Sequence, residues 1–273
     1  MDNRKRQSQI TAPGTRSGSS PGHFSVSVPS AQYGFTGTRF GVSGSTLKLF
    51  AIITMLIDHT GAAVVNTIFA VGNLQTKHYE LYQFLRTLYS WMRGVGRLAF
   101  PIFCFLIVEG YFHTRSVLKY CERLFLFALI SEIPFDYALK QSVPFWNKQN
   151  VYFTLLIALI CIWAMDQARG MGAVQFAALA SAMYLADALK TDYNYKGVFL
   201  IAMLYLFHDH RLYQCAAGAA SIAWEKYAPL SYILCFFYNG KRGLNLRYLF
   251  YVFYPGHLLI LGFIRHHVIP AFF

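Results

Sequence analysis

The sequence predicts an all-α protein: a polytopic integral membrane helical bundle with about seven to nine transmembrane helices. Composition is the first reason, because 56% of the 273 residues are hydrophobic and 13% are charged, against about 45–50% and about 25% in an ordinary soluble domain. The second reason is that apolar runs of about 20 residues, the length that crosses a bilayer, follow one another from residue 46 onward. Phe and Tyr, with 25 and 19 copies, are frequent as in chains that border lipid. A soluble chain of this length could not bury so much apolar surface.

Residues 1–45 differ in composition from the rest of the chain. They are rich in Ser, Gly, Pro and Arg and contain no long apolar run. A secretory signal needs such a run near its start, and Arg4, Lys5 and Arg6 followed by polar residues do not make one. The tail cannot bury enough apolar surface to fold by itself. We therefore predict a disordered, basic, cytoplasmic tail over 1–45 and one membrane domain over 46–273.

Each apolar run beyond the tail is predicted to be a membrane-spanning helix. The predicted spans cover 47–70, 98–113, 117–139, 151–168, 172–189, 195–208, 212–237 and 247–266. The stretch 212–237 is interpreted as one long or one broken segment, and 80–96 as an amphipathic surface helix or part of another span. Basic residues of the tail, together with Lys48, place the start of the first span inside the cell. Later loops carry Lys and Arg on both sides, so the topology beyond the first span stays open.

The net charge of +12 fits this architecture better than it fits a nucleic-acid-binding protein. Binding to nucleic acid needs a solvent-facing stripe of Lys and Arg. Here many basic residues occupy the tail or short links between apolar runs, as in cytoplasmic loops, so we expect no nucleic acid partner. The five cysteines form no C-x-x-C pair, which predicts neither a disulfide framework nor a zinc site. We expect no metal.

The first span carries two ionisable residues, Asp58 and His59. Such a side chain costs about 2.5–3.5 kcal/mol in the membrane unless it meets a partner or water. Lys48 lies eleven residues before His59, which is about three helical turns, so the two share a face about 16 Å apart. With the N-terminus inside, Lys48 stands where an anionic ligand could enter, and His59, a titratable base, lies near mid-membrane. Asp58 points about 100° away and is expected to meet another helix. The alternative is that Asp58 and His59 only hydrogen-bond neighbouring helices.

Ionisable residues also mark the second and third spans. Arg97 and Glu109 bracket the second span, and Glu109 and His113 are spaced i, i+4 on one face. That pair is a weak metal motif, and a link between two helices explains it equally well. Glu132 and Asp136 stand at the end of the third span beside a proline, where packing is the more common role.

Three later segments carry polar residues at the ends of predicted helices. Asn150 opens the fourth span. Lys241 and Arg242 lie in an Asn-Gly turn, where they could hold phosphate or fix the loop on the cytoplasmic side. His257 follows a Pro-Gly break in the last span.

Seven segments, in order between about residues 46 and 260, together resemble the TraX family of bacterial membrane proteins. Each is weak alone, but seven in order are specific, and they cover nearly the whole chain except its tail. They are Leu47-Lys-x8-Ile-Asp-His-Thr-Gly61, Gly96-Arg-Leu-Ala-Phe-Pro-Ile-Phe103, Val108-Glu-Gly-Tyr-x-His-Thr114, Ile130-Ser-Glu-Ile-Pro-Phe-Asp136, Gln149-Asn-Val-x-Phe-Thr154, Tyr238-Asn-Gly-Lys-Arg-Gly243 and Phe253-Tyr-Pro-x-His257.

The resemblance implies an acetyl-CoA-dependent N-acetyltransferase of the bacterial inner membrane that caps the N-terminal amine of a pilin-type subunit in conjugative transfer. The acceptor need not be pilin, and another peptide with a free N-terminal amine would serve. The resemblance also implies kinship with a broader group of transmembrane acyltransferases, whose first span carries a basic residue, ten residues and then a histidine essential for acyl transfer. Lys48 and His59 match that spacing, with Lys where many members have Arg. The polar tail is longer than the family pattern.

The expected chemistry assigns roles to the residues above. Acetyl transfer to an amine needs a base and donors that stabilise the developing oxyanion. We predict His59 as the general base, or as a transient acetyl carrier, with Asp58, Glu109 or Glu132 orienting it. The residues predicted to bind CoA are Lys48, Arg97, Asn150, Lys241 and Arg242, whose basic members can pair with phosphate.

Two other functions remain open from the sequence. In a proton-coupled transporter or flippase, the intramembrane carboxylates and histidines would relay protons or bind a polar substrate, although no internal repeat is visible. A non-catalytic assembly protein would tolerate His59→Ala with full function.

Overall fold

The computed structural model describes residues 41–72, 74–140, 142–244 and 247–272. The predicted tail over 1–45 lies, apart from its last residues, outside this part of the chain. Every regular element of the described residues is a helix, and two isolated β-bridges are the only extended pairings among them. The all-α class is therefore confirmed. Two helices are long and apolar enough to cross a membrane, Gly44–Phe69 with 26 residues and Tyr79–His113 with 35, so the count of seven to nine spans stays a prediction.

The first helical rod begins with a capped helix. Helix α1 (Gly44–Thr60) starts after Ser43, whose Oγ accepts a hydrogen bond from the Thr46 amide at 3.2 Å, the usual way to satisfy a free N–H at a helix start. The rod continues through a π-helical turn, Gly61–Val65, into α2 (Asn66–Gly72). α1 packs against three other helices, α4, α5 and α12, which makes it central to the bundle.

The second rod joins a segment whose role the sequence left open to a predicted span. After the short α3 (Leu74–Lys77), α4 (Tyr79–Gly96) runs through a turn into α5 (Ala99–His113). α4 packs against α1, and 80–96 belongs to the 35-residue candidate span Tyr79–His113. It also keeps an exposed apolar stripe at helical spacing, made of Leu81, Phe84, Leu88 and Trp91.

The middle of the chain forms four further helices close to the predicted boundaries. They are α6 (Val117–Leu139), α7 (Val151–Gln167), α8 (Gly172–Ala188) and α9 (Asn194–Leu206). α7 is surrounded by α6, α8 and α9, which explains why its sequence is apolar all round.

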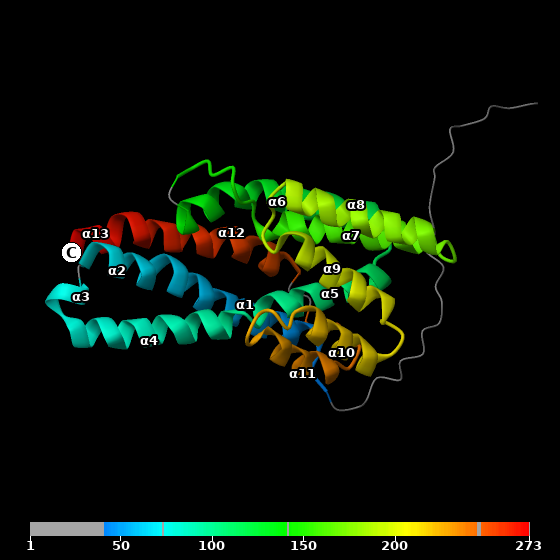
Figure 1. Ribbon diagram of the computed structural model, residues 1–273, viewed down its shortest axis with the longest axis horizontal. Coiled ribbons are helices and arrows are strands. Elements are labelled where there is room, and N and C mark those ends of the chain that lie inside the picture. The colour runs from blue at the N-terminus through cyan, green and yellow to red at the C-terminus, as the bar shows by residue number, and fades with distance from the viewer. Residues whose placement is uncertain (1–40, 73, 141, 245–246, 273) are drawn as a thin grey trace, which may run out of the picture. The chain divides into compact units, whose positions relative to one another are not determined.

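The last third of the chain resolves the ambiguous stretch 212–237 as a broken segment. It consists of α10 (Arg211–Ser221), a 3₁₀ turn (Ala228–Leu230) and α11 (Ser231–Phe236). The closing rod comprises α12 (Arg247–Phe263), a second π-helical turn (Ile264–Val268) and α13 (Ile269–Phe272). α12 packs along α6 and also contacts α1. Figure 1 shows α2, α3, α4 and α13 toward one end of the bundle and α9, α10 and α11 toward the other.

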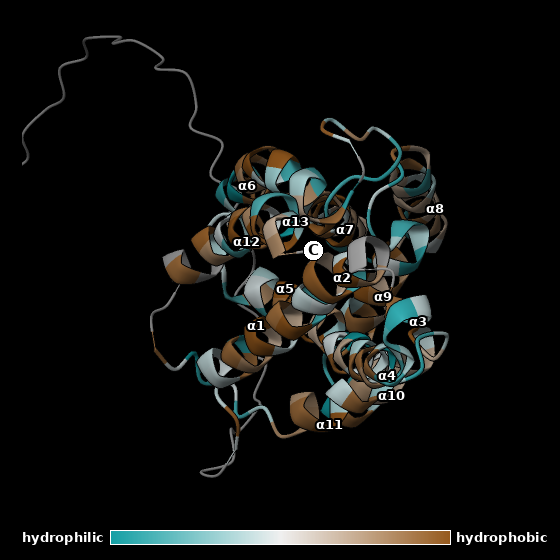
Figure 2. Ribbon diagram, turned by 90° about the vertical axis from the view of Figure 1, so that its left-hand side faces the viewer, coloured by the Kyte–Doolittle hydropathy of each residue, from teal (hydrophilic) through white to brown (hydrophobic). Residues whose placement is uncertain are grey.

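Apolar and polar residues are distributed unevenly over this bundle. Apolar colour dominates the helices in Figure 2, and polar residues gather in α3 and in connecting segments. Large apolar side chains also stand on the outside of the bundle, as on α6, where the exposed ones include Phe125, Leu126, Leu129, Ile130 and Ile133. An outward apolar face of this length is what a helix bordering lipid presents.

Candidate functional site

The bundle brings together two histidines that are 198 positions apart in the sequence. His59, in the last turn of α1, has its Nδ1 atom 2.7 Å from Nε2 of His257 in α12. Nδ1 of His257 lies 2.7 Å from the main-chain oxygen of Phe253. The side chain of His257 is buried, with a residue exposure of 5%. The two imidazoles therefore form a hydrogen-bonded chain that ends on the backbone of α12.

Aromatic rings and an irregular backbone surround this histidine pair. The ring of Tyr254 meets His59 edge-on with centres 6.1 Å apart, and Phe253 stacks on His257 at 4.7 Å. The π-helical turn of the first rod begins two residues after His59, at Gly61. π-turns inside helices occur frequently at functional sites, so the local backbone agrees with a special role for this region.

Asp58 turns away from His59 and pairs with a residue that the sequence analysis did not select. Its Oδ2 atom lies 2.6 Å from Nη1 of Arg93 in α4. The expectation that Asp58 meets another helix is therefore confirmed, and its predicted role in orienting His59 has no hydrogen bond to support it. The two helices approach closely here, because any side chain at Gly96 would overlap Asp58. Arg93 was not selected because 80–96 was interpreted as an amphipathic helix, and charged residues on such a helix are expected to face water.

Arg97 lies beside this ion pair rather than at the end of the bundle where Lys48 lies. Its Nη1 atom is 3.3 Å from Oε1 of Glu225. The neighbouring Tyr193 has a left-handed backbone, with φ of 63°, and its ring stacks on Phe100 at 3.6 Å. A non-glycine residue held in that region is uncommon and clusters at functional sites.

Glu132 and Asn150 join two helices. The Glu132 carboxylate accepts from the main-chain and side-chain nitrogens of Asn150. The Asn150 amide also donates to the Ala128 carbonyl at 2.7 Å and accepts from the Tyr152 amide at 3.0 Å. Asn150 is fully buried, and its polar atoms cap α7 and tie it to α6. The structure thus gives Asn150 a structural place, its predicted contact with CoA stays a prediction, and no hydrogen bond joins Glu132 to His59 among the described residues.

Glu109 likewise contacts other residues than His59. Its Oε1 atom lies 3.0 Å from Nη1 of Arg211 and 3.5 Å from Nε2 of His208. His113 bonds the main-chain oxygen of Glu109 at 2.7 Å, within the same helix. Among the residues that the structure describes, no cluster of three or more metal-ligating side chains occurs. Glu109 therefore links α5 to the start of α10 through Arg211, and not through His113 as the second alternative had it.

Loss of the Glu109 carboxylate is expected to cost stability rather than chemistry. Because Glu109→Gln removes the carboxylate charge that pairs with the largely enclosed Arg211, we expect a loss of about 3 kcal/mol in the free energy of unfolding. Thermal unfolding of the detergent-solubilised protein measures this change. The double variant Glu109→Leu/Arg211→Leu, which removes both charges, should recover most of the loss. Unchanged stability together with abolished activity would instead place Glu109 in the catalytic site.

A loop with two of the predicted CoA-binding residues covers the start of α1. The carbonyls of Lys241 and Arg242 accept from the amides of Gly44 and Ser45 at 2.8 and 3.0 Å. Gly243 ends this loop with φ of +69°, a conformation that favours glycine. The side chains of Lys241 and Arg242 are exposed, and Lys48 lies one helical turn further along α1. The structure therefore brings these three predicted basic residues to one end of the bundle.

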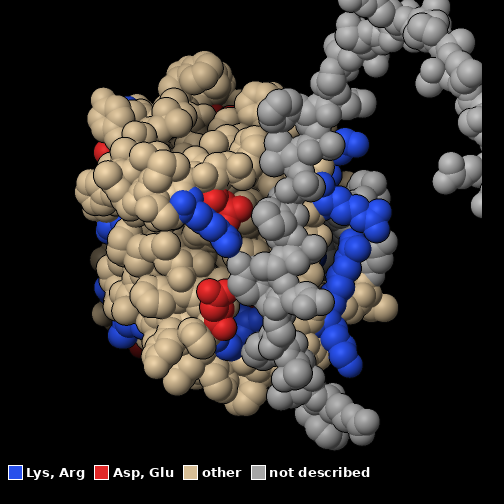
Figure 3. Space-filling view, turned by 90° about the vertical axis from the view of Figure 1, so that its right-hand side faces the viewer, with Lys and Arg blue, Asp and Glu red and all other residues tan. Residues whose placement is uncertain are grey.

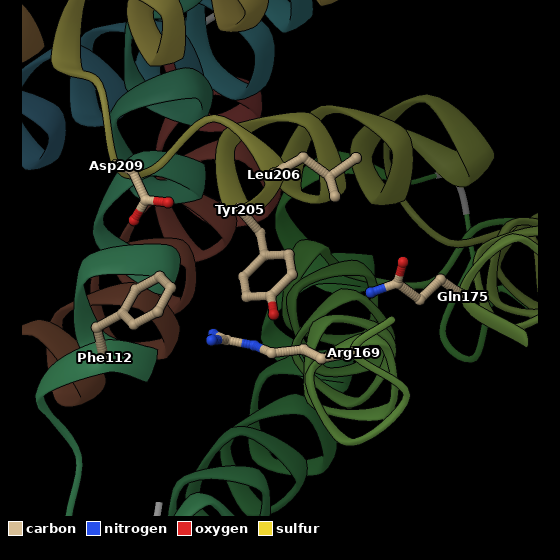
Figure 4. Close-up of a pocket in the computed structure, with 6 residues that line it drawn as sticks. All are labelled: Phe112, Arg169, Gln175, Tyr205, Leu206 and Asp209. Carbon is tan, nitrogen blue, oxygen red and sulfur yellow. The ribbon is translucent and has the colours of Figure 1, made fainter. Parts of the chain in front are cut away.

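A small pocket lies elsewhere, between the ends of α5, α7 and α9. It has room for about 160 Å³, and Figure 4 shows its lining residues, Phe112, Arg169, Gln175, Tyr205, Leu206 and Asp209. Beside it the buried Asp166 carboxylate accepts from Tyr111 and Tyr205 at 2.8 and 2.7 Å. None of the predicted site residues lines this pocket. Figure 3 shows one face of the molecule, on which scattered Lys and Arg side chains and a few Asp and Glu side chains stand in a broad uncharged surface.

Comparison with known proteins agrees with this arrangement of segments. Residues 43–265 match the family described as TraX protein, a match that includes α1, α5, the 238–244 loop and His257. A relative named "Probable fimbrial assembly protein FimC, serogroup H1", from Dichelobacter nodosus, is 28% identical over 249 residues, covering 80% of this chain and 94% of the relative. No solved structure matches the chain. Since the family match extends over far more than half of the sequence, this chain belongs to the TraX family.

Proposed function

We propose that this protein is a multi-pass membrane N-acetyltransferase of the bacterial inner membrane. It would transfer the acetyl group of acetyl-CoA to a free amine, with the N-terminus of a pilin-type subunit as the preferred acceptor. The observation that carries this proposal is the hydrogen-bonded chain of His59, the buried His257 and the Phe253 carbonyl. An imidazole held in place inside an apolar bundle is suited to proton transfer near neutral pH.

The reaction assigns His59 a defined task. The amine nitrogen attacks the carbonyl carbon of the thioester, and the tetrahedral intermediate collapses as the carbon–sulfur bond breaks. His59 takes the proton that the amine loses and returns it to the departing thiolate, so that CoA leaves as a thiol. A base positioned in this way contributes about 10²–10⁴-fold to such a reaction.

The end of the bundle that carries Lys48, Lys241 and Arg242 can bind the phosphates of acetyl-CoA through their positive charges. Lys241 and Arg242 are exposed beside the start of α1, and Lys48 follows on the same helix. About 16 Å of helix rise separates Lys48 from His59, and the predicted shared face is preserved because α1 is unbroken between them. CoA carries its thioester at the end of a long flexible arm, so phosphate binding at one level and chemistry at another are compatible.

The membrane location rests on several helices together. Two rods pass the length and apolarity test for a span, and α7 and α9 are shorter apolar helices. The apolar outer face of α6 and the TraX family match add to this. The fimbrial name of the 28% identical relative supports a pilin-like acceptor.

The proposal is tested by acetyl transfer with purified, detergent-solubilised full-length protein. Labelled acetyl-CoA is supplied with a pilin-derived peptide that has a free N-terminus, and with the same peptide blocked at its N-terminus. We expect label on the free peptide alone. CoA binding without transfer would point to a different acceptor. Neither binding nor turnover by folded protein would favour a proton-coupled transporter.

A charge variant tests the donor-binding end. Because each charge-assisted hydrogen bond is worth about 1.5–3 kcal/mol, Lys241→Ala/Arg242→Ala should raise KM for acetyl-CoA by about tenfold or more and leave kcat little changed. The control Lys77→Ala/Arg86→Ala removes two exposed basic residues from α3 and α4 and should leave KM as it is. An unchanged KM in the first variant would show that the phosphates bind elsewhere.

A further inference from the structure

The hydrogen bond between the two histidines determines which nitrogen of each ring carries a proton. Nδ1 of His257 faces the carbonyl oxygen of Phe253 at 2.7 Å, and a carbonyl can only accept. Nδ1 of His257 must therefore be the N–H donor. A neutral imidazole has one N–H, so Nε2 of His257 is an acceptor.

The same reasoning extends to His59. Its Nδ1 atom lies 2.7 Å from the acceptor Nε2 of His257, so Nδ1 of His59 carries the proton. The remaining nitrogen, Nε2 of His59, then holds the lone pair. Proton positions in the pair thus follow from a single backbone carbonyl.

Ring geometry shows that this hydrogen bond is well aligned. The planes of the two imidazoles differ by 4° and their centres are 5.1 Å apart. A ring nitrogen lies about 1.1 Å from its ring centre, so two rings joined end to end by such a bond have centres about 5 Å apart. The observed distance between the ring centres is reached only when Nδ1 of His59 and Nε2 of His257 both lie on the line that joins the two ring centres. The rings are therefore coplanar and joined edge to edge.

We propose that His257 is a positioning residue that fixes the orientation and tautomer of His59, so that Nε2 of His59 is the base. This inference rests on the proposed function for the role of that base, but the tautomer itself does not depend on it. When Nε2 takes up a proton, the positive charge of His59 is shared with Nδ1–H, which already donates to His257. Asp58 makes no hydrogen bond to His59, and its Oδ2 atom pairs with Arg93 in α4.

Two substitutions separate the acceptor function of His257 from its other contacts. In His257→Gln, the side-chain carbonyl oxygen can reach the position of Nε2 and accept from His59. In His257→Asn, the shorter side chain ends near the position of Nδ1 and cannot reach His59. Both replacements are polar and of similar volume, so a difference between them reports on the hydrogen bond.

The direct test is ¹⁵N NMR of histidine-labelled full-length protein in lipid, with the His59 signals assigned by their loss in His59→Ala. Nitrogen shifts distinguish protonated from unprotonated ring nitrogens. We expect Nδ1–H and an unprotonated Nε2 for His59 in the wild type and in His257→Gln. In His257→Asn the His59 signals should shift to a mixture containing the Nε2–H form. A wild-type His59 protonated on Nε2, or signals that are the same in His257→Asn, would overturn the proposal.

Kinetics give a second readout. Outer contacts that orient a functional histidine are typically worth 10–100-fold, so kcat should fall about 100-fold in His257→Asn and within about tenfold in His257→Gln, with KM for acetyl-CoA unchanged in both. Equal losses in the two variants would contradict a role through the hydrogen bond. If the wild type transfers no acetyl group, the proposed function fails, and the NMR result still decides the tautomer.

Discussion

Replacement of His59 by alanine is expected to reduce acetyl transfer by about 10³-fold, because the amine then has no positioned base. The measurement is transfer of labelled acetyl from acetyl-CoA to a free-amine peptide by the purified variant. Binding of CoA should persist, since Lys48, Lys241 and Arg242 are untouched. The reduction should therefore be in kcat.

The matched control is His210→Ala. His210 is exposed before α10 and makes no side-chain cap, so its loss should leave transfer within about twofold, as for surface substitutions generally. Full activity of His59→Ala would remove His59 from the chemistry. Full pilus-related function of His59→Ala in cells, with no transfer by the wild type, would identify a non-catalytic assembly protein.

The variant Gly96→Ala is expected to lower the free energy of unfolding by about 2–3 kcal/mol, as overpacking a tight contact does. The added methyl group would overlap Cβ of Asp58, an atom fixed by the backbone of α1 that no rotamer change can move. α1 and α4 must then separate, which also stretches the 2.6 Å ion pair between Asp58 and Arg93. The fall in melting temperature should be roughly 5–10 °C.

Gly172→Ala is the matched control for this variant. A Cβ at Gly172 in α8 would meet nothing within 4 Å, so its melting temperature should stay close to that of the wild type. Intrinsic tryptophan fluorescence during heating in detergent measures both variants. Equal melting temperatures for Gly96→Ala and the wild type would mean that α1 and α4 are less tightly packed than the structure has them.

Local sequence patterns were sufficient to predict where the helices lie, but not which helices pack against each other. The predicted span 117–139 coincides with α6, because an unbroken apolar run between polar links is a signal within one segment. The same holds for the broken stretch 212–237, whose polar residues around Glu225 interrupt it. The division between 80–96 and the predicted span 98–113 also matches the turn between α4 and α5, where the charged Arg97 interrupts the apolar run.

The candidate site shows the limit of sequence reasoning more clearly. His59 and Asp58 were selected because ionisable residues inside an apolar run are rare. Their partners, His257 and Arg93, depend on which helices pack together, and no spacing along the chain reports that. His257 was visible as a histidine after a Pro-Gly break, whereas Arg211, the first residue of α10, was not selected from the sequence. For neither residue does a sequence pattern indicate which side chain it contacts.

The length of the α4–α5 rod has a consequence for how the bundle sits in a bilayer. Its 35 residues span about 52 Å, against a hydrocarbon thickness of about 30 Å. Even a tilt of about 40°, the upper end for membrane helices, leaves a projection near 40 Å. This hydrophobic mismatch means that about 10 Å of the rod stands outside the hydrocarbon. Arg93 lies about 30 Å along the rod from its His113 end, which is about 23 Å across the bilayer at the same tilt. Under the proposed function, an acceptor arriving from the side opposite the His113 end would therefore cross only part of the hydrocarbon to reach His59, the neighbour of Asp58.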